Sequence, residues 1–222
     1  MKEIVNAKEP FNFYTRLHLT ELTGLKASSI PELLILIKEV PESSIYHHTH
    51  RFLQQHQYLS PEPPNDFAYW VGNVIGDDKL GEKLASIDTV QFVSIGSLRE
   101  KIVSVIEDHL KSHPRSADRF TMEDEAFHFM KSLSFIMPTQ YTVGNLREFA
   151  EALKKVTIDS IYFHIFEARL RLGKKANDFS LWIESSIGDK ELADKILKMD
   201  PYTYTLEDLR KSIVKMVEKR IS

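Results

Sequence analysis

Two histidines, His48 and His164, are the residues of this chain best suited to chemistry, because each stands at the same place in a repeated sequence pattern. An imidazole changes charge near neutral pH, so a histidine with a partner can transfer protons or bind a ligand. A carboxylate follows each of them, Asp66 after the first and Asp178 after the second. Such a pair suits acid–base chemistry, and it also suits a hydrogen bond that ties two helices together. Lone buried histidines usually serve packing, which favours the second interpretation.

The neighbours of the first histidine invite a test of metal binding. His47 and His50 are three residues apart and therefore share one face of a helix. The second copy of the pattern has Phe163 and Phe166 at these places, and no His-Glu-x-x-His motif accompanies either copy. We therefore predict no metal and no cofactor. Both pattern histidines are expected to face inward, to be hydrogen-bonded, and to have a pKa lowered by burial.

Aromatic residues accompany both His/Asp pairs and extend the set of candidates. At helical spacing with apolar partners, a tyrosine or tryptophan is more often a core residue than a pocket wall. Asp66 and Asp178 follow asparagine at the start of a helix, so we interpret them first as capping residues. No residue is assigned a catalytic role. The candidate ligand-binding residues are Tyr46, His48, Asp66, Trp70, Tyr162, His164, Asp178 and Trp182.

These candidates occur in pairs because the chain repeats itself. Residues 44–48 (SIYHH) return as residues 160–164 (SIYFH), 116 residues later, and residues 65–70 (NDFAYW) return as residues 177–182 (NDFSLW), 112 residues later. The change in offset indicates a four-residue insertion in the first copy. A repeat of this length is a domain-sized copy rather than a solenoid unit. The predicted organisation is a first copy over residues 1–112, a linker over 113–121 and a second copy over 122–222.

The elements that carry the motifs are predicted to be mainly helices. Apolar residues recur at helical spacing in four to five segments of each copy, and Gly76-Asp77 and Gly188-Asp189 each end one helix and cap the next. Alternating apolar residues indicate one short strand per copy, over 11–20 and 127–136, although a helix fits these segments nearly as well. The predicted fold is therefore mainly α, close to all-α, with two pseudosymmetric halves and at most one short strand in each.

Composition limits the classes of protein that fit. The 222 residues include 42% hydrophobic residues and no cysteine, which suits a globular protein of the cytoplasm and excludes disulfides and thiolate chemistry. No segment has the roughly 20 apolar residues that a membrane span needs. The net charge of −3 disfavours nucleic acid and anionic membranes as partners. A basic cluster is interleaved with acidic residues and is interpreted as a solvated helix face; it comprises Arg169, Arg171, Lys174 and Lys175.

The tandem pattern Ser-Ile-Tyr-x-His followed by Asn-Asp-Phe-x-x-Trp resembles a prokaryotic domain family of unknown function, from about Phe11 to Ile221. The resemblance implies no activity and no catalytic residue. We predict a non-catalytic cytoplasmic binding or regulatory module that recognises a small ligand or a protein partner between its two halves. The alternative is an enzyme that uses a His/Asp pair at the same cleft. The sequence is also compatible with a homo-oligomer.

Overall fold

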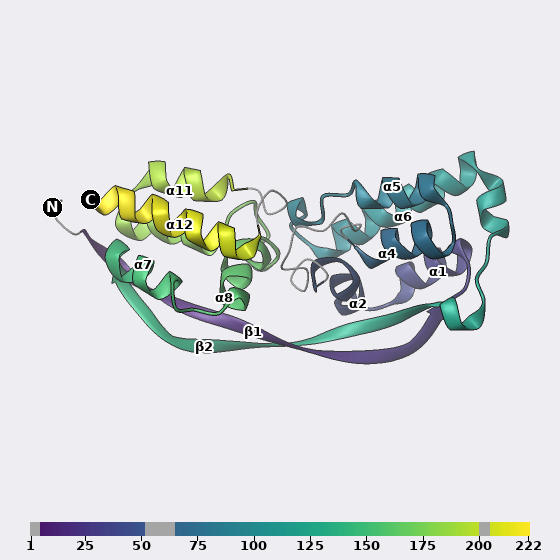
Figure 1. Ribbon diagram of the computed structural model, residues 1–222, viewed down its shortest axis with the longest axis horizontal. Coiled ribbons are helices and arrows are strands. Elements are labelled where there is room, and N and C mark those ends of the chain that lie inside the picture. Colours follow the sequence, from purple (N-terminus) through teal and green to yellow (C-terminus); the bar gives the residue numbers. More distant parts are fainter. Residues whose placement is uncertain (1–4, 52–64, 200–204) are drawn as a thin grey trace. The chain divides into compact units, whose positions relative to one another are not determined.

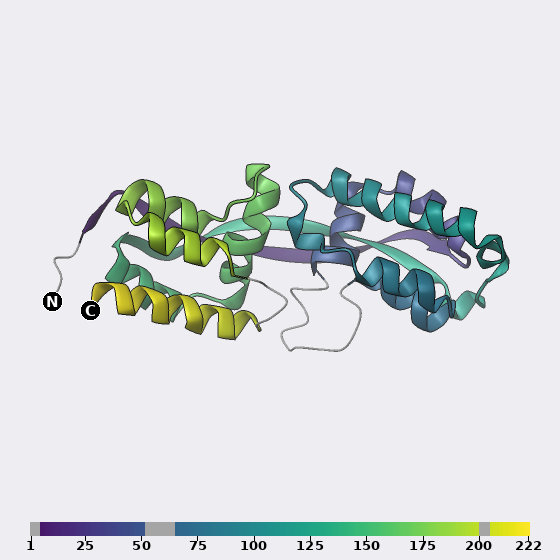
Figure 2. The same cartoon turned by 90° about the horizontal axis from the view of Figure 1, so that it is seen from above.

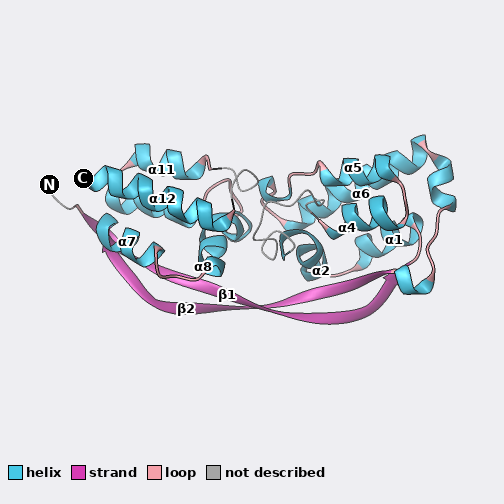
Figure 3. Ribbon diagram, viewed as in Figure 1, coloured by secondary structure: helices cyan, strands magenta, loops and turns pink. Residues whose placement is uncertain are grey.

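A computed structural model of the chain describes residues 5–51, 65–199 and 205–222. It combines helices with two long strands that pair with each other (Figures 1 and 3). Strand β1 comprises Asn6–Ala27, 22 residues, and strand β2 comprises Phe127–Asn145, 19 residues. Thr23 Oγ1 donates a hydrogen bond to the Phe129 carbonyl (2.7 Å), and Thr139 Oγ1, further along β2, donates to the carbonyl of Phe13 (2.8 Å). The partners run in opposite directions, so the ribbon is antiparallel.

The length of these strands shows that the prediction of a mainly α, nearly all-α fold is wrong. Segments 11–20 and 127–136 are strands, but each continues well beyond the predicted range. The alternation of buried and exposed residues marks only the start of each strand, at Phe11 and Phe13 in β1. Further along, Leu17 and Leu19 are both exposed. A strand that loses cover on one face loses the period-two pattern by which sequence reveals it.

Contacts between residues divide the chain into two compact units that are described separately. Among the described residues, the N-terminal unit comprises residues 18–51 and 65–134. The C-terminal unit comprises residues 5–17, 135–199 and 205–222. Each unit therefore takes strand residues from both copies of the repeat.

The N-terminal unit packs its helices around a single apolar core. Side-chain caps start several of these helices; for example, Asn65 Oδ1 accepts a hydrogen bond from the Ala68 N–H (2.9 Å). The Gly76 φ of 73° and the Asp77 cap confirm the predicted helix junction. The elements are α1 (Ile30–Glu39), α2 (Glu42–Tyr46), η1 (His47–Arg51), α4 (Asp66–Tyr69), η2 (Trp70–Val74), α5 (Asp78–Ala85), η3 (Thr89–Gln91), α6 (Ile95–Ser112), η4 (Pro114–Asp118) and η5 (Glu123–Glu125).

The C-terminal unit repeats this order of elements. The Gly188 φ of 83° and the Asp189 cap form the same junction before α11, and α12 packs against both α7 and α11 (Figure 2). The elements are α7 (Leu146–Leu153), α8 (Ile158–Tyr162), η6 (Phe163–Glu167), α9 (Ala168–Leu172), α10 (Asp178–Trp182), η7 (Ile183–Ile187), α11 (Lys190–Leu197) and α12 (Leu206–Ile221).

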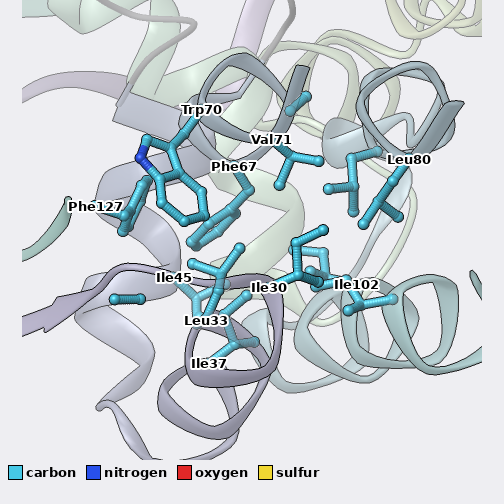
Figure 4. Close-up of a cluster of buried hydrophobic side chains, with 14 of the residues drawn as sticks. Ile30, Leu33, Ile37, Ile45, Phe67, Trp70, Val71, Leu80, Ile102 and Phe127 are labelled. Carbon is cyan, nitrogen blue, oxygen red and sulfur yellow. The ribbon is translucent and has the colours of Figure 1, made fainter. Parts of the chain in front are cut away.

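The strands are exchanged between the copies. In the N-terminal unit, Phe127 of the second copy packs against Phe67 and Trp70 of the first, with ring centroids 5.3 and 5.8 Å away (Figure 4). In the C-terminal unit, Phe13 of the first copy stacks on Phe149 of the second, with ring centroids 5.7 Å apart. Each set of helices therefore buries the phenylalanines that begin the other copy. Neither core is complete without a strand that lies about a hundred residues away in sequence.

Phe13→Ala should destabilise the C-terminal unit, although Phe13 lies near the N-terminus of the chain. Phe13 is 1% exposed, and emptying such an aromatic site costs about 3–5 kcal/mol. Urea unfolding followed at the Trp182 and Trp70 indole N–H resonances would separate the two units. Leu22→Ala, in the same strand at a residue 70% exposed, is the control and should change stability by less than about 0.5 kcal/mol. Loss of the Trp70 signal before that of Trp182 would contradict the exchange of strands.

Candidate functional site

The two pattern histidines lie in π-helical turns that continue the short helices carrying Ser-Ile-Tyr. His48 lies in η1 after α2, and His164 lies in η6 after α8. A π-helical turn accommodates one extra residue and is frequent where a side chain has a special task. Both histidines are almost completely buried and face the strand ribbon, with exposures of 1% and 2%. The prediction that they face inward is confirmed.

Each histidine connects a carboxylate to the backbone of a strand. His164 Nδ1 lies 2.6 Å from Asp178 Oδ2, and its Nε2 accepts a hydrogen bond from the Tyr14 N–H at 2.8 Å. Because Nε2 accepts, the neutral ring carries its proton on Nδ1 and donates it to the carboxylate. The predicted hydrogen bonding is therefore confirmed, with a strand N–H as a second partner that the sequence did not indicate.

The N-terminal unit contains the same arrangement. His48 Nδ1 lies 2.7 Å from Asp66 Oδ2, and its Nε2 accepts from the Met130 N–H at 3.0 Å. Both nitrogens of each ring are thus engaged, which leaves no lone pair for a substrate proton or a metal ion. In the described part of the chain, no group of three or more histidine, aspartate or glutamate side chains is arranged to hold a metal ion.

Other residues of the repeated pattern also hold the strands. The Trp182 indole donates to the Glu9 carbonyl (2.8 Å), and the Trp70 indole donates to the Glu125 carbonyl (2.8 Å). Ser160 Oγ donates to the carbonyl of Tyr14, whose N–H already binds the histidine. We call the His, Asp and Trp side chains of each unit its strand clamp. The clamp satisfies backbone groups on the strand edge that the ribbon leaves unpaired.

The remaining sequence candidates have simpler surroundings. Tyr162 is buried, and Tyr46 Oη lies 3.2 Å from His18 Nε2. Asp66 and Asp178 are the first helical residues, and the capping residues are the asparagines before them, Asn65 and Asn177. The structure therefore brings the eight candidates together in two separate groups of four, one in each unit.

Burial sets the protonation of the histidines. Loss of hydration lowers the pKa of His164, and the Asp178 carboxylate opposes this shift more weakly. In the N-terminal unit, burial and the neighbouring His48 lower the pKa of His47 to about 4. His47 Nδ1 lies 2.9 Å from Ser132 Oγ, so the neutral ring is hydrogen-bonded.

A cleft of about 460 Å³ opens beside the clamp of the C-terminal unit. His164, Asp178 and Trp182 form part of its wall, and Tyr14 and Ile136 of the ribbon form another part. A second cleft of about 610 Å³ lies in the N-terminal unit along α5 and α6, and none of the candidates lines it. Only the first cleft therefore joins predicted site residues to open space among the described residues.

Arg171 is the cleft residue that sequence reasoning missed. Its Nη2 lies 2.5 Å from Asp178 Oδ2, and its guanidinium carbon lies 4.1 Å from the ring centroid of Phe163. The arginine is thus partly buried rather than fully solvated, and its side chain is 30% exposed. A signal was present in the spacing, because Arg171 stands seven residues after His164 and seven before Asp178. That places all three on one side of a helix–turn–helix segment.

Comparison with known families identifies the class of protein to which this chain belongs. Residues 8–218 match the family described as "Family of unknown function (DUF5752)", so the chain is a member of that family, and the expected resemblance to an uncharacterised family is confirmed. The chain is also similar to a solved structure, OrfY from Thermoproteus tenax, with 27% identity, a TM-score of 0.80 and 96% of each chain covered. No curated protein matches it. Within the described ranges, no helix is both long and apolar enough to cross a membrane.

His164→Leu should destabilise the C-terminal unit, and His48→Leu the N-terminal unit, by about 1–3 kcal/mol each. Leucine fills much of the ring's volume but leaves a buried strand N–H without an acceptor, and that is the cost of one unsatisfied group. Chemical unfolding monitored at Trp182 and Trp70 assigns each effect to its unit. Wild-type stability in both variants would show that the clamp does not hold the strands.

Lowering the pH should destabilise the N-terminal unit through His47. Its folded pKa of about 4 lies below the unfolded value near 6.5, so the full stability is present above pH 6.5 and declines as the unfolded chain takes up a proton that the folded chain excludes. The loss between pH 7 and pH 5 should be about 2 kcal/mol.

His47→Phe, which introduces the residue of the second copy, should flatten that dependence in a series of unfolding titrations. His128→Gln, at an exposed residue, is the control and should keep the wild-type slope. An unchanged slope in His47→Phe would contradict the assignment.

Proposed function

We propose that this protein is a non-catalytic binding module whose ligand is a small molecule held in the cleft of the C-terminal unit. The observation that carries the proposal is the position of this cleft, which His164, Asp178 and Trp182 share with Arg171. Its volume of about 460 Å³ lies in the range of small-molecule pockets, and its wall mixes aromatic side chains with a few polar groups. The proposal concerns this unit alone.

The state of the histidine supports binding rather than catalysis. A general base needs a free lone pair within reach of the substrate. His164 Nε2 already accepts the Tyr14 N–H, and Nδ1 donates to Asp178. The Asp178 carboxylate is shared between His164 and Arg171, so it is not free to accept a substrate proton either. The enzyme alternative would require the clamp to open.

Two indole groups make the proposal testable, because each unit contains one tryptophan. In a screen of small polar and aromatic fragments against ¹⁵N-labelled protein, we expect some fragments to shift the Trp182 indole N–H resonance, since Trp182 lines the cleft. The Trp70 resonance should stay in place and serves as the internal reference. A fragment that binds should be recovered chemically unchanged. Shifts confined to Trp70, or conversion of a bound fragment to product, would contradict the proposal.

A further inference from the structure

The hydrogen-bonding capacity of the C-terminal cleft is dominated by unused donors. Arg171 uses only Nη2, for Asp178 and the Phe163 carbonyl, and its Nε and Nη1 bind none of the described residues. Ser186 is 9% exposed and lines the cleft, yet its hydroxyl has no hydrogen-bond partner in the described part of the chain. Asn12 Oδ1 accepts from Thr142, which leaves its amide N–H groups available. A ligand rich in acceptors would satisfy these groups.

The free edge of the guanidinium is held in a fixed orientation. Stacking on Phe163 at 4.1 Å fixes the plane of the group, and the bond to Asp178 fixes its rotation within that plane. Two parallel N–H groups on a fixed plane match the two oxygens of a carboxylate. Arginine at this place therefore acts as a preformed anion site, with little conformational entropy left to lose on binding.

The two copies differ where the cleft needs a polar group. Ser186 occupies the position that Val74 occupies in the first copy, 112 residues earlier, and Val74 packs against the apolar core of its own unit. A serine in place of a core valine leaves a buried hydroxyl that lowers stability unless something binds it. This unpartnered hydroxyl is independent of Arg171 and also points to a ligand.

Resting on the proposed function, the geometry points to a small monocarboxylic acid as the ligand, with its carboxylate on Arg171 and Ser186 and its apolar body against Ile136, Leu181 and Trp182. A single negative charge fits better than two. Asp178 already takes part of the arginine's charge, and Glu9 adds a second carboxylate to the lining, so a phosphate dianion would meet net repulsion.

Binding of benzoate, benzamide and inorganic phosphate to the full chain, read at the Trp182 and Trp70 indoles at constant ionic strength, tests this inference. Benzoate should shift Trp182 and bind at least about tenfold more tightly than the neutral benzamide or phosphate. Arg171→Gln should abolish that preference. Ser186→Val, which restores the residue of the first copy and keeps the apolar packing, should weaken benzoate several-fold. Arg119→Gln, in the N-terminal unit, is the matched control and should bind benzoate as the wild type does.

The outcomes separate the ligand class from the cleft itself. If benzamide shifts Trp182 as strongly as benzoate, or if Arg171→Gln and Ser186→Val both keep wild-type binding, the carboxylate inference is overturned while the cleft remains a ligand site. Stronger binding of phosphate than of benzoate overturns the choice of a monoanion. If none of the three probes shifts Trp182 and the fragment screen also fails, both the inference and the proposed function are overturned.

Discussion

The hydrogen bond from a strand N–H to a buried histidine is the interaction on which each unit depends. A two-stranded ribbon leaves one edge of each strand without a partner strand, and a buried N–H without an acceptor is costly. His164 accepts this group from Tyr14, and Asp178 fixes the tautomer that allows it to do so. The imidazole thus performs for the strand edge what a third strand would otherwise do. A neutral ring is required, because a doubly protonated imidazole cannot accept.

Exchange of the strands makes the two copies mutually dependent for their cores. Phe129 belongs to the second copy by sequence but is fully buried in the N-terminal unit, while Phe13 shows the reverse. A helical set without its strand would lose two buried aromatic side chains and would expose the histidine that binds the strand. Folding therefore has to bring together segments about a hundred residues apart, which raises the entropic cost of closure while ensuring that neither core forms alone.

The sequence revealed much of the local structure and little of the long-range pairing. The duplication, the Gly76-Asp77 junction and the inward histidines all follow from short-range rules of spacing and capping. The strand ribbon did not follow, since Leu17 and Leu19 are exposed apolar residues that carry no period-two signal. The strand N–H partners also escaped prediction, because a backbone donor has no letter in the sequence. Arg171 was treated as one charge of a basic cluster until its contact with Asp178 set it apart.

Residues that both copies share are a poor guide to a ligand site in such a duplicated chain. The clamp is present twice because each unit must hold a strand, so its repetition reflects the fold. A specific ligand needs only one site, and its determinants are expected where the copies diverge. Ser186 opposite Val74 and Tyr14 opposite Met130 are differences of this kind, and both second-named residues belong to the unit without the arginine-lined cleft. The shared clamp then supplies a rigid wall, and the unshared residues supply the hydrogen-bonding pattern that selects the ligand.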